Sequence, residues 1–293
     1  MNFDIAELAA LTGAVFVLGM PHGALDGREA RDILRPRLGS RWLGPFILFY
    51  LGLAGATLLL WLTAPLAALI LFFALSALHF GSHDSTSKRA IPLLTRGSLP
   101  MVVASAAHPQ STAGIFGVLA GKANGALLQE WLAGPLFWLW LGGAAATLLL
   151  ERDIWPRLEL VGLALLFALA PPLVAFALYF GLIHSPRALR EARRPGERWS
   201  SLLLAALPWS AAAGVLAVPL WMLSAPIIGE GSALVRTIFW WLSALTVPHM
   251  LLHLIVQRSS EPMTVGPALG ETSKAPNAQQ SIRVGTGFNH NLA

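Results

Sequence analysis

Four histidines stand out because each lies in an otherwise apolar segment: His22, His79, His184 and His249. An ionisable side chain inside a bilayer is costly, so it marks a functional site unless a structural role explains it. Neutral imidazoles are good ligands for iron, copper, nickel and zinc. If the four segments cross a membrane and place these rings at one depth, the pattern predicts a transition-metal site.

The composition is typical of a membrane protein. Of the 293 residues, 55% are hydrophobic and 12% are charged, which favours a polytopic membrane protein over a soluble domain. There are no cysteines, so thiolate ligands, disulfides and iron–sulfur clusters are excluded, and any metal must be held by His, Asp or Glu. The net charge of +5 is attributed to orientation in the lipid bilayer and not to a nucleic-acid partner.

The apolar runs predict an all-α fold, a polytopic transmembrane helix bundle of about nine membrane helices (eight to ten), at roughly 20 residues for each span. Pro65 and the pair at 171–172 mark helix ends, and Pro109 is expected to break one long run. The predicted spans are 5–25, 41–63, 65–83, 91–120, 128–150, 157–171, 172–190, 199–222 and 234–257. Residues 1–257 therefore form one transmembrane domain, and residues 258–293 form a polar tail that is expected to be disordered.

Positive charge supports this threading. All of the 20 Lys and Arg residues except Lys122 and Arg236 fall on the same side of the membrane. The positive-inside rule assigns that side to the cytoplasm, which predicts a multi-pass inner-membrane protein with an outside N-terminus and a cytoplasmic C-terminus. The four spans that carry the histidines then run in the same direction, and the rings lie at the same depth within roughly one or two helical turns.

Each N-terminal histidine has a structural explanation that competes with a metal role. In residues 21–26, Asp26 could orient the His22 ring, as partners of metal-bound histidines do, or it could cap the following turn beside an incidental histidine. His79 and His83 lie one turn apart on one helix face. His83 is nearer the interface, so it could be a ligand or a side chain that faces water.

The C-terminal histidines present the same choice. A polar residue at a helix end can snorkel to the interface, but that does not explain His184, which precedes the end of its span. His249 follows a proline inside a helix, so it could bind a metal or repair the broken backbone ladder. His253 shares the face of His249 and could support it. His108 beside Pro109 has the same repair explanation, which we favour there.

Aromatic residues are abundant, with 11 Trp and 14 Phe. In a membrane protein they most often form interfacial belts, and we expect this of Trp240 and Trp241. The aromatic residues close to the histidines in sequence are better candidates for contact with a substrate: Phe80, Phe176, Tyr179 and Phe180.

The chemistry of an all-histidine site stays open at this point. Zinc would favour hydrolysis through an activated water. An apolar bundle instead favours a lipid-soluble substrate and O₂, both of which partition into the bilayer. The residues alone predict a non-haem metal site in a membrane, with an unknown substrate.

Four motifs together resemble the Brp/Blh family of membrane β-carotene 15,15'-dioxygenases. They lie at residues 21–28, 79–84, 179–187 and 248–250, and the resemblance extends over all the predicted helices in order. It implies an iron(II) cofactor, Fe²⁺, and cleavage of the central double bond of β-carotene by O₂. Two molecules of retinal would result, and in this family they typically serve a microbial rhodopsin.

The resemblance also implies roles for individual residues. Three positions match iron ligands of the family: His22, His79 and His184. The family usually has a further histidine one turn later, where this chain has Ala188. Either His249 or His83 completes the set, or three histidines hold the iron, or activity has been lost. We hypothesise His249 as the fourth ligand.

Three more polar residues are predicted to surround these ligands: Asp26, Asp84 and His253. They would orient the imidazoles and would not act as acid–base catalysts. The remaining function classes are a carotenoid- or retinoid-binding protein without activity, a bis-histidine haem electron carrier and a proton-coupled transporter. A di-iron desaturase is disfavoured because the sequence lacks paired HxxHH motifs.

Overall fold

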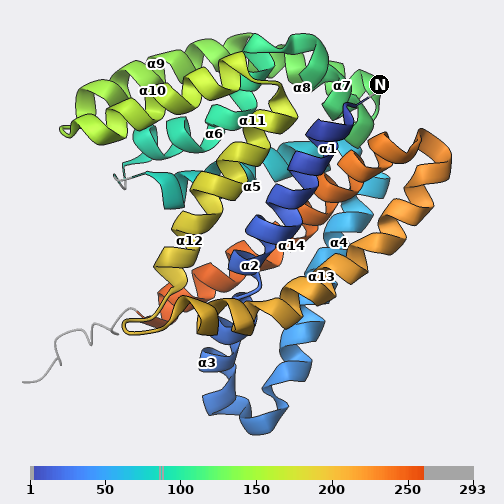
Figure 1. The fold of residues 1–293 in the computed structure, drawn as a ribbon, viewed down its shortest axis with the longest axis vertical. Coiled ribbons are helices and arrows are strands. Elements are labelled where there is room, and N and C mark those ends of the chain that lie inside the picture. The colour runs from blue at the N-terminus through green and yellow to red at the C-terminus, as the bar shows by residue number, and fades with distance from the viewer. Residues whose placement is uncertain (1–2, 86, 88, 261–293) are drawn as a thin grey trace, which may run out of the picture.

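The computed structural model describes residues 3–85, 87 and 89–260, and within them every regular element is a helix (Figure 1). The N-terminal elements are α1 Ile5–Thr12, η1 Gly13–Gly19, α2 Met20–Gly23, α3 Asp26–Leu38, η2 Gly39–Trp42, α4 Leu43–Thr63, α5 Pro65–Asp84, α6 Ala90–Ala107 and α7 Pro109–Ala120. The C-terminal elements are α8 Lys122–Ala133, α9 Pro135–Leu150, α10 Ile154–Leu169, α11 Pro172–Tyr179, η3 Phe180–His184, α12 Ser185–Ala192, α13 Trp199–Ile228 and α14 Glu230–Ser260. The predicted all-α class is confirmed for this part of the chain, and the polar tail beyond Ser260 lies outside it.

The helix breaks fall where the prolines predict them. α4 ends at Thr63 and α5 begins at Pro65, because proline is well tolerated in the first turn of a helix but not in its interior. α7 begins at Pro109, after a junction at His108 that divides the long run 91–120 in two. α11 begins at Pro172.

The count of membrane spans is only partly settled. Six helical runs in the described residues are long and apolar enough to cross a bilayer: Ile5–Thr63, Pro65–Asp84, Ala90–Ala107, Lys122–Leu150, Trp199–Ile228 and Glu230–Val256. The first of these is not one straight helix, because α1–α2 and α4 run as two separate legs joined by α3 (Figure 1). α10 and the α11–α12 stretch consist of shorter pieces. The number nine therefore stays a prediction.

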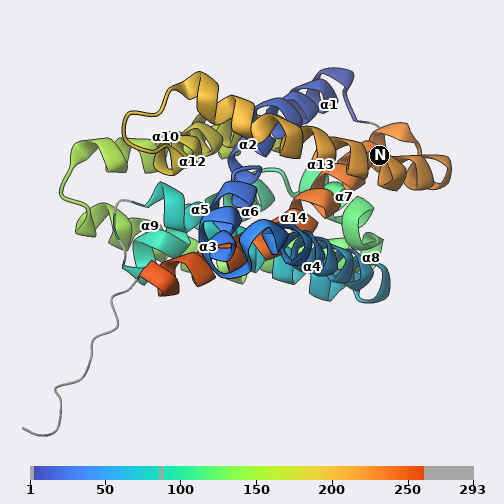
Figure 2. The ribbon, with the colours of Figure 1, turned by 90° about the horizontal axis from the view of Figure 1, so that it is seen from below.

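The long helix α14 is the axis of the bundle. It packs against α13, α4, α7, α5 and α3. Seen from the end that carries α3, α13 and α4 flank α14 on opposite sides (Figure 2). Many large apolar side chains on the outer helices are exposed, as expected of surfaces that contact lipid.

The basic links gather on one side of the molecule. The α9–α10 link, the α12–α13 link and the end of α14 lie on the left in Figure 1, with α3 below them, whereas the α13–α14 turn lies on the right. The two links on the left, the end of α14 and α3 all carry arginines that the threading places on the basic side. We call this side the basic face. The arrangement agrees with the threading, while the compartment that it faces stays a prediction.

Two glycines let α5 and α6 approach closely. A Cβ atom on Gly97 would overlap the backbone of Ala77, and one on Gly81 would overlap the carbonyl of Leu93. Small residues at a helix interface allow such contact in membranes, where van der Waals packing replaces the hydrophobic effect as the driving force. Gly81 lies two residues after His79, so this close packing also fixes the helix segment that presents His79 to the site.

Candidate metal centre

Two π-helical segments position His22 and His184. η1 spans Gly13–Gly19 and leads directly into the short helix α2 that carries His22, and η3 spans Phe180–His184 and ends on a histidine. π-helical turns are rare and occur often at functional sites. The two segments pack against each other, and a Cβ on Gly19 would overlap the ring of Phe180. This contact brings the His22 and His184 rings to a centroid separation of 5.5 Å.

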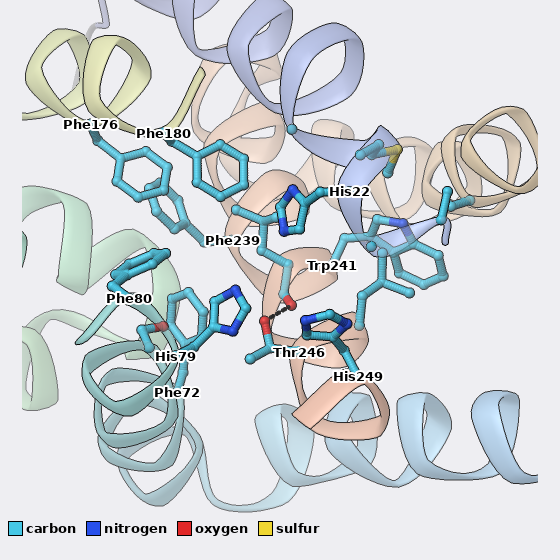
Figure 3. Close-up of a pocket in the computed structure, with 18 of the residues that line it drawn as sticks. His22, Phe72, His79, Phe80, Phe176, Phe180, Phe239, Trp241, Thr246 and His249 are labelled. Carbon is cyan, nitrogen blue, oxygen red and sulfur yellow. Dashed lines mark hydrogen bonds between the residues drawn. The ribbon is translucent and has the colours of Figure 1, made fainter. Parts of the chain in front are cut away.

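His79 and His249 reach the same place from α5 and α14. The His79 ring centroid lies 5.0 Å from that of His184 and 5.0 Å from that of His249. His22 is 6.1 Å from both His79 and His249. Figure 3 shows His22, His79 and His249 facing one another across a cavity. The predicted convergence of the four rings, which we call the inner cluster, is thus confirmed, while their metal role stays a prediction.

Nitrogen atoms face each other within the inner cluster. The Nε2 atoms of His79 and His184 are 3.2 Å apart, and one ligand nitrogen from each of His22, His79 and His184 lies within 4.8 Å of the other two. Two imidazole nitrogens on one metal at about 2.1 Å would be about 3 to 3.4 Å apart. His249 groups instead with His79 and His83 under the same limit. His22, His79 and His184 therefore form one compact triad, and His249 shares His79 with a second group.

Carboxylates lie on the outward nitrogens of two rings. His249 Nδ1 is 2.8 Å from Asp26 Oδ1, and the hydroxyl of Tyr50 donates to the other oxygen of Asp26 at 2.9 Å. His184 Nδ1 is 3.6 Å from Asp84 Oδ1, in ion-pair range. Metal-bound histidines commonly donate their second N–H to such a carboxylate, which fixes the tautomer and the ring plane. Asp26 thus orients His249 and not His22, which the local motif had suggested.

Asp84 is itself held by two donors. The Tyr179 hydroxyl donates to one of its oxygens, and Arg187 donates to the other at 2.8 Å. Arg187 also binds Glu159 at 2.8 Å. This network ties α5, α10 and α12 together beside His184.

The donor set fits a metal ion. Among the described residues, the buried atoms His22 Nδ1 and His249 Nε2 have no hydrogen-bond partner. A buried polar atom without a partner is costly, and a bound ion is one explanation for such an atom. When the His249 ring is neutral and donates its Nδ1–H to Asp26, its Nε2 carries the free lone pair that a metal requires. Neutral imidazoles of this kind suit iron(II), and they can equally bind copper, nickel or zinc.

The remaining histidines have other surroundings. His83 Nδ1 is 2.5 Å from Glu191 Oε2, and His253 Nδ1 is 3.8 Å from Glu29 Oε2. His253 stacks edge-on against His249 at 4.5 Å, which agrees with the expected position beside a ligand. His108 sits at the α6–α7 junction and lines a separate cavity, away from the inner cluster.

A cavity of about 350 Å³ opens onto the inner cluster. Figure 3 shows Phe80, Phe176 and Phe180 on one side of the imidazoles and Trp241 on the other. Three of the four aromatic residues predicted for substrate contact therefore line it. Tyr179 does not line it: residues 176 and 180 share one helix face, whereas the hydroxyl of Tyr179 donates to Asp84.

Sequence reasoning also misplaced the tryptophan pair and missed much of the cavity wall. Trp240 and Trp241 are buried, not at a lipid interface: Trp240 donates to the Leu119 carbonyl at 3.1 Å, and Trp241 lines the cavity. The wall residues without a sequence signal include Phe72, Phe239, Thr246 and Tyr50. They lie in ordinary apolar runs, so only the three-dimensional packing identifies them.

Known proteins share this chain's pattern along most of its length. The sequence profile of the family described as Beta-carotene 15,15'-dioxygenase matches residues 13–256, which include every predicted site residue. A beta-carotene 15,15'-dioxygenase from an uncultured marine bacterium is 31% identical over 266 residues, which cover 86% of this chain and 94% of the relative. A probable beta-carotene 15,15'-dioxygenase, Blh, from Halobacterium salinarum is 28% identical over 287 residues, which cover 84% and 83%. No solved structure matches.

Proposed function

Because the chain belongs to the beta-carotene 15,15'-dioxygenase family, we propose that it cleaves β-carotene with O₂ at the central 15,15' double bond, giving two molecules of retinal. One observation carries this proposal. Four imidazoles from four separate parts of a membrane protein converge, and three of them, His22, His79 and His249, line one apolar cavity. A lipid-soluble polyene can reach such a site from the bilayer, and so can O₂.

The inner cluster would hold iron(II). His22, His79 and His184 form the compact triad, and we assign His249 as the fourth ligand. Ala188, at the usual family position of a fourth histidine, is buried and offers no donor. When bound, iron(II) would activate O₂ for addition to a carbon–carbon double bond.

The protein's own polar groups would set the orientation of the rings. Asp26 holds the Nδ1–H of His249, so Nε2 of that ring points toward the other imidazoles. Asp84 faces Nδ1 of His184 and leaves Nε2 of that ring toward His79. Tyr50 and the Tyr179–Arg187 pair fix the two carboxylates in turn. These contacts aim the Nε2 atoms of both rings inward, and no acid–base step is assigned to the carboxylates.

The cavity would position the polyene and exclude water. Phe176 and Phe180 stack at 5.4 Å with nearly parallel rings, and Phe80 lies edge-on to His184 at 4.7 Å. Flat aromatic walls suit a planar conjugated chain, and fixing its central bond beside the imidazoles supplies much of the advantage of an intramolecular reaction. Each half of the cleaved chain then leaves with one oxygen atom as an aldehyde.

Expression in bacteria that make β-carotene tests the proposal. Loss of the orange colour with accumulation of retinal is expected, together with about one iron per chain in purified protein. Retention of intact carotenoid with no iron would identify a carrier instead. A haem absorption band in the purified protein would identify an electron carrier. Either result would overturn the proposed reaction.

A further inference from the structure

Below the inner cluster lies a second layer of ligating side chains that the proposed reaction does not use. His83 follows His79 by one turn on α5, and His253 follows His249 by one turn on α14. Their ring centroids are 6.3 Å apart. Glu191 from α12 is the acidic partner of His83, and Glu29 from α3 is that of His253. We call these four residues the outer cluster.

The outer cluster is open to water where the inner cluster is not. The His83 and His253 side chains are 17% and 32% exposed, and that of Glu191 is 51% exposed. The His184 side chain, in contrast, is fully buried. Glu191 and His83 are therefore more accessible to a hydrated cation than His184 is.

The two layers are joined by shared members. His79, His83 and His249 form one group whose ligand atoms lie within 4.8 Å of one another, and Asp26, His249 and His253 form another. The rings of His79 and His83 are 4.9 Å apart, and those of His249 and His253 are 4.5 Å apart. The two groups share His249, and both contain rings of the inner cluster. An ion that moved inward could therefore exchange its ligands one at a time.

The charge around the outer cluster also favours a cation, although the face as a whole is basic. Three arginines of the basic face have carboxylate partners outside the outer cluster: Arg28 with Glu197, Arg194 with Asp32, and Arg187 with Asp84 and Glu159. The ion pairs recorded for Glu29 and Glu191 are with histidines instead. The buried Oε2 of Glu29 has no hydrogen-bond partner.

We propose that the outer cluster is the loading route of the metal site: Glu191, His83, Glu29 and His253 capture a divalent iron ion at the basic face and pass it to the inner imidazoles. This inference rests on the proposed function, since it requires a metal at the inner cluster. A mixed carboxylate–imidazole set suits transient binding of a partly hydrated iron(II) ion, and the neutral, buried imidazoles beyond it are the final ligands.

The competing explanation is that the outer cluster only holds helices together. Both roles would lower stability when the cluster is altered, so thermal unfolding does not separate them. The rate of metal uptake does, because a purely structural contact changes neither the rate nor the final amount of metal in protein that stays folded.

The experiment measures metal loading of detergent-purified apoprotein. Iron(II) is added without oxygen, samples are quenched with chelator at set times, and bound iron per chain is measured. The double variant Glu29→Gln/Glu191→Gln should load at least about tenfold more slowly than wild type and still reach the same final stoichiometry. Asp32→Asn is the matched control, because the Asp32 side chain is 53% exposed on the same face but lies outside the cluster. It should load at the wild-type rate.

The outcomes separate this inference from the proposed function. Wild-type loading by the double variant overturns the loading route and leaves the enzyme proposal intact. Equally slow iron loading by Asp32→Asn also overturns the loading route, because negative charge anywhere on this surface would then explain the loading rate. A second ion held stably by wild type would make the outer cluster a resident site and not a route. Failure of wild type to take up any metal overturns both proposals.

Discussion

Helices α5 and α14 each carry two histidines four residues apart, yet the members of each pair differ in exposure and in their partners. His79 and His249 are buried and face other imidazoles across the cavity. His83 and His253 are partly exposed, and each has a glutamate from another helix as its ion-pair partner. Residue type and helical spacing are identical, so neither distinguishes the inner from the outer ring. Depth in the bundle and the partner on the far helix make the difference, and both come from packing.

The largest effect is expected from the loss of an inner ring. His79→Ala removes a nitrogen 3.2 Å from that of His184, so the protein should lose its iron, and retinal formation should fall more than about 100-fold. Elemental analysis and product chromatography measure the two quantities. The matched control His83→Ala, one turn away on the same helix, should keep its full iron content at equilibrium. Equal loss of iron in both variants would show that His79 and His83 belong to a single metal site, which would contradict the division into two layers.

A smaller effect is expected from the carboxylate that orients an inner ring. Asp26→Asn keeps the shape beside His249 but removes the charge that holds its Nδ1–H, so iron affinity should fall about 10- to 100-fold. Glu29→Gln, beside the outer ring His253, should leave the equilibrium affinity unchanged. Competition with a chelator of known affinity measures both. A similar loss in both variants would mean that negative charge alone matters and would contradict the orienting role.

The smallest effect is expected at the rim, beyond both layers. The backbone N–H of Arg194 and the guanidinium of Arg28 hold the pKa of Glu197 below its ordinary value of 4.5. A lowered pKa contributes stability that is present above the unfolded-state value and is lost as the pH falls through the folded-state value. Glu197→Gln should therefore unfold at a slightly lower temperature than wild type at pH 7 and at the same temperature once the pH is below the folded-state pKa of Glu197.

Iron content of that rim variant is its internal control. It should equal the wild-type content at pH 7, because the Arg28–Glu197 pair touches neither cluster. A difference in unfolding temperature that persisted undiminished at low pH would show that Glu197 contributes through packing and not through its charge.

Much of the fold could be predicted because its signals are local. Apolar runs specify membrane helices, and Pro65, Pro109 and Pro172 lie at the ends that they predict. The number of spans could not be fixed, because α10 and the α11–α12 stretch are short and their lengths do not say whether they cross the bilayer. The π-helical turns were also missed, since an i→i+5 ladder has no distinctive residue pattern.

The site shows a similar division. The four histidines were predictable because imidazole inside an apolar span is rare and has few structural explanations. Their partners were not, because Asp26 and His249 are 223 positions apart and nothing in either local segment indicates the pairing. Tyr179 was expected beside Phe176 and Phe180 in the cavity wall because closeness along the chain was taken for a shared direction. Successive side chains on a helix point in different directions, and only residues three or four apart share a face.

The two π-helical segments have a consequence for the evolution of this site. A π-helical turn holds one residue more than an α-helical turn. The side chains after each segment are therefore rotated about the helix axis relative to those before it. A chain lacking that residue in η1 and η3 would remain just as hydrophobic and would insert into lipid equally well. Its imidazoles at 22 and 184 would nonetheless be turned away from their present direction. The hydrophobicity of such a helix determines whether it enters the bilayer. A single inserted residue determines the direction in which its histidine side chain points. Single-residue gaps between relatives deserve scrutiny at these two places first.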